Sequence, residues 1–216
     1  MTLRHINFVS WAIIAAVSFF HSTPAAAQDE PLKFEITPFT AYRIGGQFDE
    51  KDGDGQFELN ETDAQGIMLN VLANPNGQYE LLYARQDTEV DTQGLFATDP
   101  ILDLDVEYFQ FGGTYLFDGE NTRPFIALTL GVTHFDPQPA EFDSESYFSA
   151  SFGGGVQLNA TKRIGVRIEG RVFTTLIESD SDIFCSSAGG TGTCLIQVDG
   201  TALTQWEARV GLVFRF

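Results

Sequence analysis

The clearest pattern in the chain is the alternation of apolar and polar side chains over residues 203–216. A period of two predicts a β-strand, because successive side chains of a strand point to opposite faces of a sheet. The apolar row continues to the last residue, where a soluble strand would fray, so we interpret this row as facing lipid. It consists of Thr204, Trp206, Ala208, Val210, Leu212, Phe214 and Phe216.

Residues 164–173 repeat the pattern with a denser row of charge. Arg167, Glu169 and Arg171 occupy alternate positions between apolar residues. Burying an unpaired charge costs several kcal/mol, whereas opposite charges that pair inside a protein are tolerated. A closed barrel with the charged rows inside and the apolar rows toward lipid satisfies both faces, which is the pattern of a transmembrane β-barrel.

Six further segments alternate in the same way, so the chain contains eight predicted strands. The connections between them are alternately long and short, which eight antiparallel strands with both termini in the periplasm require. We therefore predict an all-β fold, an eight-stranded antiparallel transmembrane β-barrel with four long outer loops and three short periplasmic turns. The predicted strands are 34–47, 64–73, 78–86, 104–117, 123–134, 147–158, 164–173 and 203–216, and the long loops are 48–63, 87–103, 135–146 and 177–202.

The strand predicted at 104–117 is the hardest to divide into an inward and an outward row. We assign Phe109 and Phe111 to its outward row, which places Asp105 and Glu107 on the same row. Charged side chains do not face lipid at the membrane centre without a large cost, so we expect this pair of acids to lie above the membrane.

Residues 1–27 are predicted to be a secretory signal peptide. Arg4 and His5 precede an apolar run that is too short to span a bilayer, and the run ends in an Ala-x-Ala cleavage site at 25–27. The mature domain is then 28–216, and it contains no stretch of about 18 apolar residues that would form a transmembrane helix. An exported β-patterned chain without such a helix indicates the outer membrane of a Gram-negative cell.

The composition argues against some classes of function. The formal net charge is −18, which argues against nucleic-acid binding. The two cysteines, Cys185 and Cys194, lie in a stretch rich in glycine, serine and threonine, and we predict that they form a disulfide in an oxidising compartment. Their spacing does not fit a CxxC redox or metal site.

The chain resembles the small outer-membrane barrels of the OmpA/OmpX type. The resemblance covers nearly all of the mature chain and is carried by the segments 42–46, 111–115 and 210–216 together with the signal peptide. It implies an outer-membrane location and contact with lipopolysaccharide. It also implies that the barrel-assembly machinery reads a carboxy-terminal signal made of Val210, Leu212, Phe214 and Phe216.

The inward rows predict a charged barrel interior. An eight-stranded barrel is just wide enough to be filled by its own side chains, so a neutral network would plug it. This predicts an envelope-structural or adhesive surface protein, and the alternative is a narrow channel or conduit for small solutes. The predicted network contains four acids and four bases: Glu35, Glu80, Glu169, Glu207, Arg43, Arg167, Arg171 and Arg209.

The outer loops carry most of the acidic residues, so their charge must be solvated or neutralised by cations. Residues 50–61 match much of a twelve-residue calcium loop and predict a calcium site, the one cofactor that the sequence suggests. The alternative is an ordinary hairpin tip, since Asp-Gly pairs also form turns. The candidate ligands are Glu50, Asp52, Asp54, Gln56 and Glu61.

We expect no enzymatic activity. Some eight-stranded barrels hydrolyse or transfer lipid A acyl chains with a histidine and a serine at the outer rim, and His134 with Ser144 or Ser146 lies in such a region. The sequence shows no nucleophile elbow, phosphate loop or zinc-ligand cluster. A third possibility, a soluble lipocalin-like barrel, would place the charges of the last two strands in a ligand cavity.

Overall fold

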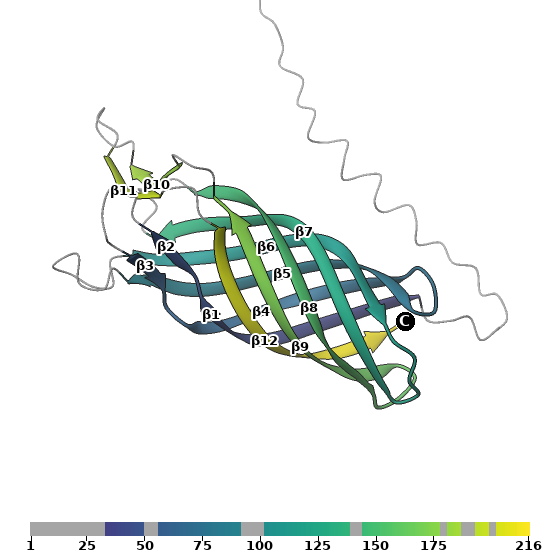
Figure 1. The fold of residues 1–216 in the computed structure, drawn as a ribbon. Helices are drawn as coiled ribbons and strands as arrows, with labels where there is room; N and C mark the ends of the chain where they lie inside the picture. The colour runs from purple at the N-terminus through teal and green to yellow at the C-terminus, as the bar shows by residue number, and fades with distance from the viewer. Residues whose placement is uncertain are drawn as a thin grey trace, which may run out of the picture. The chain divides into compact units, whose positions relative to one another are not determined.

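Eight long antiparallel strands close into a barrel in the computed structural model of the protein (Figure 1). The predicted all-β, eight-stranded antiparallel barrel is thereby confirmed. The sheet closes because β1 pairs with β12 and β5 pairs with β6. The long strands are β1 Phe34–Gly45, β4 Thr62–Leu72, β5 Gly77–Asp91, β6 Leu102–Leu116, β7 Thr122–Gln138, β8 Glu145–Asn159, β9 Ile164–Leu176 and β12 Ala202–Arg215.

The structure describes seven ranges of the chain, and the predicted signal peptide lies outside them. The described residues are 33–49, 56–91, 102–138, 144–177, 181–186, 193–198 and 202–216. Within these ranges no helix is long and apolar enough to cross a membrane.

Two of the predicted outer loops contain short hairpins. The loop predicted at 48–63 contains β2 Gln47–Asp49 and β3 Gln56–Leu59, and β3 also pairs with the outer end of β5. The loop predicted at 177–202 contains β10 Ser181–Ser186 and β11 Thr193–Val198. Gly45 and Gly46, with φ of 81° and 111°, allow the chain to turn from β1 into β2.

The two ends of the barrel differ in their connections. Three short turns and the carboxy terminus lie at one end, called the turn end here, and β2 and β3 lie at the other, called the loop end (Figure 1). The first short turn is shaped by Asn74, whose side-chain oxygen accepts hydrogen bonds from the backbone N–H groups of Asn76 and Gly77 at 3.1 and 2.8 Å.

The pairing register is continuous around the barrel. It defines the stagger of the barrel, which is the offset along β1 after one circuit of paired residues. One row of paired, outward-facing residues can be followed around all eight strands, and it returns to β1 ten residues beyond its start, at Ile44 instead of Phe34. An eight-stranded barrel with this stagger has strands tilted by about 40°, so a row climbs by about 3 Å from each strand to the next. The row is Phe34, Val71, Tyr79, Gly113, Leu128, Phe152, Val172, Trp206 and Ile44.

The polar side of the barrel wall changes along the barrel axis. In the half nearer the turn end, outward side chains are apolar and many inward ones are polar or charged. In the half nearer the loop end, β5 and β6 reverse this pattern. Arg85, Asp87 and Glu89 of β5 and Asp103, Asp105 and Glu107 of β6 lie on the outer wall, while Val90, Leu104 and Val106 are buried inside.

Candidate functional site

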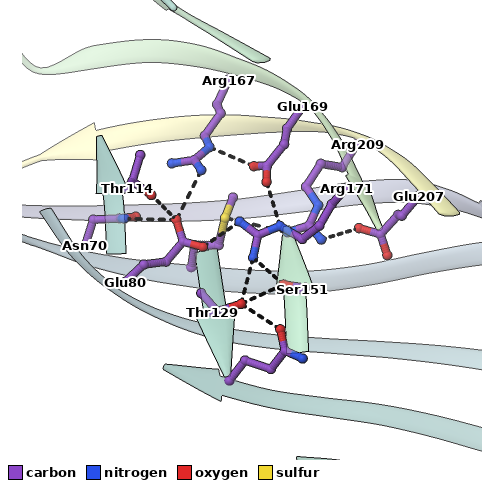
Figure 2. A network of polar contacts seen from close by, with 12 residues as sticks. Asn70, Glu80, Thr114, Thr129, Ser151, Arg167, Glu169, Arg171, Glu207 and Arg209 are labelled. Carbon is purple, nitrogen blue, oxygen red and sulfur yellow. Dashed lines mark hydrogen bonds and ion pairs between the residues drawn. The ribbon is translucent and has the colours of Figure 1, made fainter. Parts of the chain in front are cut away.

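Glu80 of β5 is the centre of the charged interior (Figure 2). Its carboxylate accepts hydrogen bonds from Arg171 at 2.6 Å, Arg167 at 3.1 Å and the Thr114 hydroxyl at 2.6 Å. The amide of Asn70 donates a further bond at 3.3 Å. Glu80 is fully buried, so these donors replace the water that the carboxylate loses on folding.

Glu169 joins the two arginines from the other side. One carboxylate oxygen accepts a bond from Arg167 Nε at 2.9 Å, and the other accepts one from Arg171 Nε at 2.6 Å. Alternate residues of β9 point to the same side, so all three side chains enter the interior from one strand. Glu80 and Glu169 therefore share Arg167 and Arg171 in a closed cluster of two acids and two bases.

A second cluster lies nearer the loop end and consists of Arg43, Glu207 and Arg209. Arg43 of β1 donates to one Glu207 oxygen through Nε at 2.9 Å and Nη2 at 2.6 Å, and its third nitrogen donates to Gln86 at 3.3 Å. Arg209 Nη2 lies 2.6 Å from the other Glu207 oxygen. β1 and β12 pair with Arg43 directly opposite Glu207, so the barrel closure brings these charges together.

Glu35 does not join these clusters. It lies at the turn end, where its carboxylate accepts a hydrogen bond from Arg215 Nε at 2.7 Å. The deeper interior therefore holds the acids Glu80, Glu169 and Glu207 against four arginines, one base more than the balanced set that we predicted. The structure places all eight predicted residues inside the barrel but pairs Glu35 with a residue outside that set.

Aromatic side chains help to hold the arginines. The Arg167 guanidinium lies 3.9 Å from the centre of the Phe125 ring, and that of Arg209 lies 4.5 Å from Phe39. Arg43 lies 4.8 Å from the Tyr108 ring. Arginine above an aromatic face is attracted by about 2 kcal/mol or more when both are desolvated, which offsets part of the excess positive charge.

An apolar layer closes the interior above the charged clusters. Phe135, Leu203 and Leu104 are each at most 1% exposed and form one cluster with Leu59 from the β2–β3 hairpin and Val106. Tyr108 and Phe173, whose rings are 4.3 Å apart, separate this layer from the arginines. The charged pairs thus lie nearer the turn end, and toward the loop end buried apolar side chains lie together with polar ones such as Gln86 and Gln205.

The outer wall of the loop-end half carries a ladder of acids, which we call the acidic wall. Asp87, Asp105 and Asp136 are directly opposite one another on β5, β6 and β7. Arg85, which is paired with Glu107 in the next outward row toward the turn end, donates to Asp87 and to Asp105, both at 2.8 Å. A hollow of about 610 Å³ lies beside the ladder, and its charged lining residues are Glu61, Asp87, Glu89, Asp103 and Asp105.

The acidic wall affects the ionisation of its own carboxylates. Burial raises the pKa of Asp105, and a hydrogen bond with Asp87 and the negative charges of Asp87 and Asp136 raise it further against the opposing effect of Arg85. The hydrogen bond from Arg85 lowers the pKa of Asp87. Asp105 therefore takes up a proton before Asp87 does as the pH falls.

His134 and Ser146 are brought together at the rim of this wall. The His134 Nδ1 and Ser146 Oγ atoms are 2.8 Å apart, and β6 places Glu107 directly opposite His134. A Ser–His–acid relay requires the acid to bind the second ring nitrogen. Glu107 instead accepts a hydrogen bond from the Tyr83 hydroxyl at 2.7 Å.

The candidate calcium ligands are only partly within the described residues. Glu50, Asp52 and Asp54 lie outside them. Strand β3 extends away from Gln56, and the carboxylate of Glu61, beyond the far end of that strand, accepts a hydrogen bond from Tyr42 at 3.2 Å. The structure does not bring Gln56 and Glu61 together as a compact calcium loop would, and calcium at this loop stays a prediction.

The outward row of β12 contains the residues of the predicted assembly signal. Val210, Leu212, Phe214 and Phe216 are 46%, 52%, 36% and 60% exposed on the apolar face of the barrel. They are therefore accessible on the finished barrel surface, and their reading by an assembly machinery remains a prediction.

The strands β10 and β11 pair with Cys185 directly opposite Cys194. Opposite residues of an antiparallel pair have Cα atoms about 4.5–5.5 Å apart, within the range that a disulfide spans. The cysteine side chains lie outside the described residues, so the disulfide stays a prediction.

We expect both thiols to resist maleimide labelling in the unfolded, non-reduced protein and to react after reduction. Labelling without reductant would contradict the bond.

No family model matches the chain, and no curated protein matches it by sequence. Solved structures of outer-membrane barrels do share its fold. Outer membrane protein AlkL, solved in lipid bilayers, is 11% identical with a TM-score of 0.61, and the match covers 90% of this chain and 95% of that one. OprG from Pseudomonas aeruginosa is 14% identical with a TM-score of 0.58, over 85% and 95%. Neisserial surface protein A is 12% identical with a TM-score of 0.55, over 85% and 97%. The chain therefore has the fold of small outer-membrane barrels, as its resemblance to that group predicted.

Proposed function

We propose that the protein is a non-enzymatic barrel of the bacterial outer membrane, with its turn end in the periplasm. In this role its filled interior seals the barrel, and the acidic wall binds divalent cations at the outer leaflet. The observation that carries the proposal is the row Asp87, Asp105 and Asp136, which lies on the outer wall beyond the apolar side chains and one outward row past Arg85, Glu107 and His134. The similar folds of AlkL and OprG support the location.

The cations would be shared with lipid. In the described part of the chain no three acidic, histidine or cysteine side chains are arranged to hold a metal ion. A hydrated magnesium or calcium ion does not need such a cage and commonly bridges one or two carboxylates and a phosphate. Lipopolysaccharide phosphates would lie at the level of the acidic wall in this orientation, and the wall would anchor the outer leaflet through shared cations.

The interior favours a sealed barrel over a conduit. Glu80, Glu169, Arg167 and Arg171 occupy its turn-end half, and buried apolar side chains together with polar ones such as Gln86 and Gln205 occupy its loop-end half. We therefore expect no steady conductance steps in planar bilayers, and regular steps would support the narrow channel instead. Among the described residues, Glu107, the acid opposite His134, is bonded to Tyr83 and not to the His134–Ser146 pair, so this pair alone does not favour an enzymatic role.

The cation proposal predicts a loss of calcium-dependent binding to lipopolysaccharide vesicles in the variant Asp105→Asn, Asp136→Asn. Each exposed charge interaction contributes up to about 1 kcal/mol, so the pair of substitutions should weaken binding about tenfold. As the pH is lowered, the unmodified barrel should lose calcium-dependent binding at a higher pH than it would with an ordinary aspartate. The reason is that the pKa of Asp105 is raised and that protonated Asp105 holds no cation.

The matched control removes two charges at the opposite end of the barrel, in the variant Asp118→Asn, Glu120→Gln. Both residues belong to the second short turn, so we expect unchanged binding to vesicles of lipopolysaccharide in calcium. Equal losses in the two variants would show a general effect of net charge and would refute a role for the acidic wall.

A further inference from the structure

The lipid-facing surface of the barrel has unequal height around its circumference. On β4 the outward row has three large apolar side chains, Val71, Leu69 and Ile67, before it reaches Gln65 and Asp63. β5 repeats this arrangement, because Tyr79, Leu81 and Tyr83 are followed outward by Arg85 and Asp87. These two strands are neighbours, so the short apolar stretch is a continuous face of the barrel.

Two other strands have longer nonpolar rows: β8, which lies across the barrel from β4, and β12, which is separated from β4 by β1 alone. The outward rows of β8, from Leu158 to Phe148, and of β12, from Phe216 to Trp206, each have six consecutive positions without a polar side chain. Counted in the same way, β4 has four nonpolar positions, from Ala73 to Ile67, and β5 has four, from Gly77 to Tyr83. With a rise of about 2.4 Å per residue along the axis of a tilted strand, six positions span about 24 Å and four span about 14 Å. Outer-membrane barrels normally show a band about 25 Å tall, so β8 and β12 match it and the β4–β5 face does not.

The stagger of the barrel allows positions on different strands to be compared at one height. Since a paired row climbs by about 1.25 residues per strand, Gln65 of β4 lies at about the level of Ala208 of β12. By the same reckoning Arg85 of β5 lies level with Ala150 of β8. At the height where β12 and β8 have alanine, β4 therefore has a primary amide and β5 has Arg85, whose guanidinium reaches toward the loop end to Asp87 and Asp105.

A rigid tilt of the whole barrel would not resolve this difference. Lifting the β4–β5 face out of the bilayer would draw its periplasmic end into the bilayer. That end is polar, since Asn76 donates a hydrogen bond to Asp118 at 2.8 Å and Arg123 donates one to the Pro75 carbonyl at 2.9 Å. Burying these groups in hydrocarbon costs more than deforming the lipid, which requires only fractions of a kcal/mol per Å of mismatch.

We propose that the outer leaflet is locally thinned along β4 and β5, where lipid headgroups descend to the level of Gln65 and Arg85. The partner of this face is thus the lipid bilayer itself, at reduced thickness. The β5 end of the acidic wall, at Asp87, stands next beyond Arg85, so lipid phosphates would meet a carboxylate there. The thinning depends on the membrane location and on the heights of the apolar rows, and it does not depend on cation binding.

The test is a depth measurement with spin labels at two level positions. Gln65→Cys and Ala208→Cys are labelled one at a time in a Cys185→Ser, Cys194→Ser background, and the barrel is reconstituted in phosphatidylcholine vesicles without divalent cations. We expect the label at 65 to be relaxed mainly by a water-soluble nickel chelate and the label at 208 mainly by oxygen. The ratio of the two effects should differ severalfold between the sites.

Other outcomes overturn the proposal. Equal depths at 65 and 208 would show a bilayer of uniform thickness, and oxygen contact at a third label on Asn74 would show tilt instead of thinning. Both labels in water would contradict the membrane location itself, and with it the proposed function. Because the vesicles contain no divalent cations, failure of the cation proposal alone leaves the expected depths unchanged.

A second measurement covers the case that a label prevents folding. The variant Gln65→Leu, Arg85→Leu extends the apolar rows of both strands by one position, so its folding yield should shift toward vesicles with longer acyl chains. The control Gln65→Asn, Arg85→Lys keeps the polarity of both positions and should fold like the unmodified protein. An unchanged preference of the leucine variant would also overturn the proposal.

Discussion

Replacing Glu80 with leucine is expected to lower the free energy of unfolding in lipid vesicles by about 3–5 kcal/mol, the typical cost of breaking a buried ion pair. The substitution leaves Arg167 and Arg171 to share Glu169 alone, and it removes the acceptor of the Thr114 and Asn70 bonds. Equilibrium unfolding in urea, followed by tryptophan fluorescence, measures the change.

The control is the double variant Glu80→Leu, Arg171→Met. It removes one acid and one base, and the Arg167–Glu169 pair at 2.9 Å remains. Well-packed apolar replacements of a buried ion pair are often neutral or stabilising, so this variant should be more stable than Glu80→Leu alone. A double variant that is as unstable as the single one would show that shape, and not charge balance, determines the stability of the interior.

Replacing Leu128 with arginine is expected to destabilise the barrel by about 2–4 kcal/mol in lipid, because a charge on the lipid face near the bilayer midplane carries that cost. Leu128 is 60% exposed on the outer face of β7, so on a soluble barrel the same change would have little effect. The measurement is the same urea titration in vesicles.

Asp136→Arg is the matched control, since Asp136 lies on the same outward row of β7 as Leu128 but on the acidic wall. Above the membrane an arginine finds water and several carboxylates, so we expect a change below about 1 kcal/mol. Equal effects of the two substitutions would contradict a lipid-facing surface and would favour the soluble lipocalin-like barrel.

The fold was predictable because a period of two is visible in the sequence itself. The alternation in 164–173 and 203–216 identifies both rows of each strand, and eight such strands leave few arrangements. The interior position of Arg43, Glu80 and Glu207 follows from the same rows. Asp105 and Glu107 were assigned outward above the membrane, and the structure places both on the outer wall.

The partners inside the barrel were not predictable, because they depend on the stagger of the strands. Nothing in the sequence states that Glu80 of β5 reaches Arg167 and Arg171 across the interior, or that Arg215 is the partner of Glu35. The apolar layer was also missed. Its members Leu104 and Val106 lie at the start of the strand predicted at 104–117, on the row opposite to Asp105 and Glu107, but only charged residues were assigned to the filling of the interior.

The uninterrupted register restricts how this sequence can evolve. Inserting or deleting one residue within a strand would move every following side chain to the opposite face. On β9 that change would turn Arg167, Glu169 and Arg171 outward and bring Ile168 inward. Lineages of this barrel should therefore accumulate length changes in the long connections and substitutions in the strands, and strand insertions that survive should come in pairs of residues.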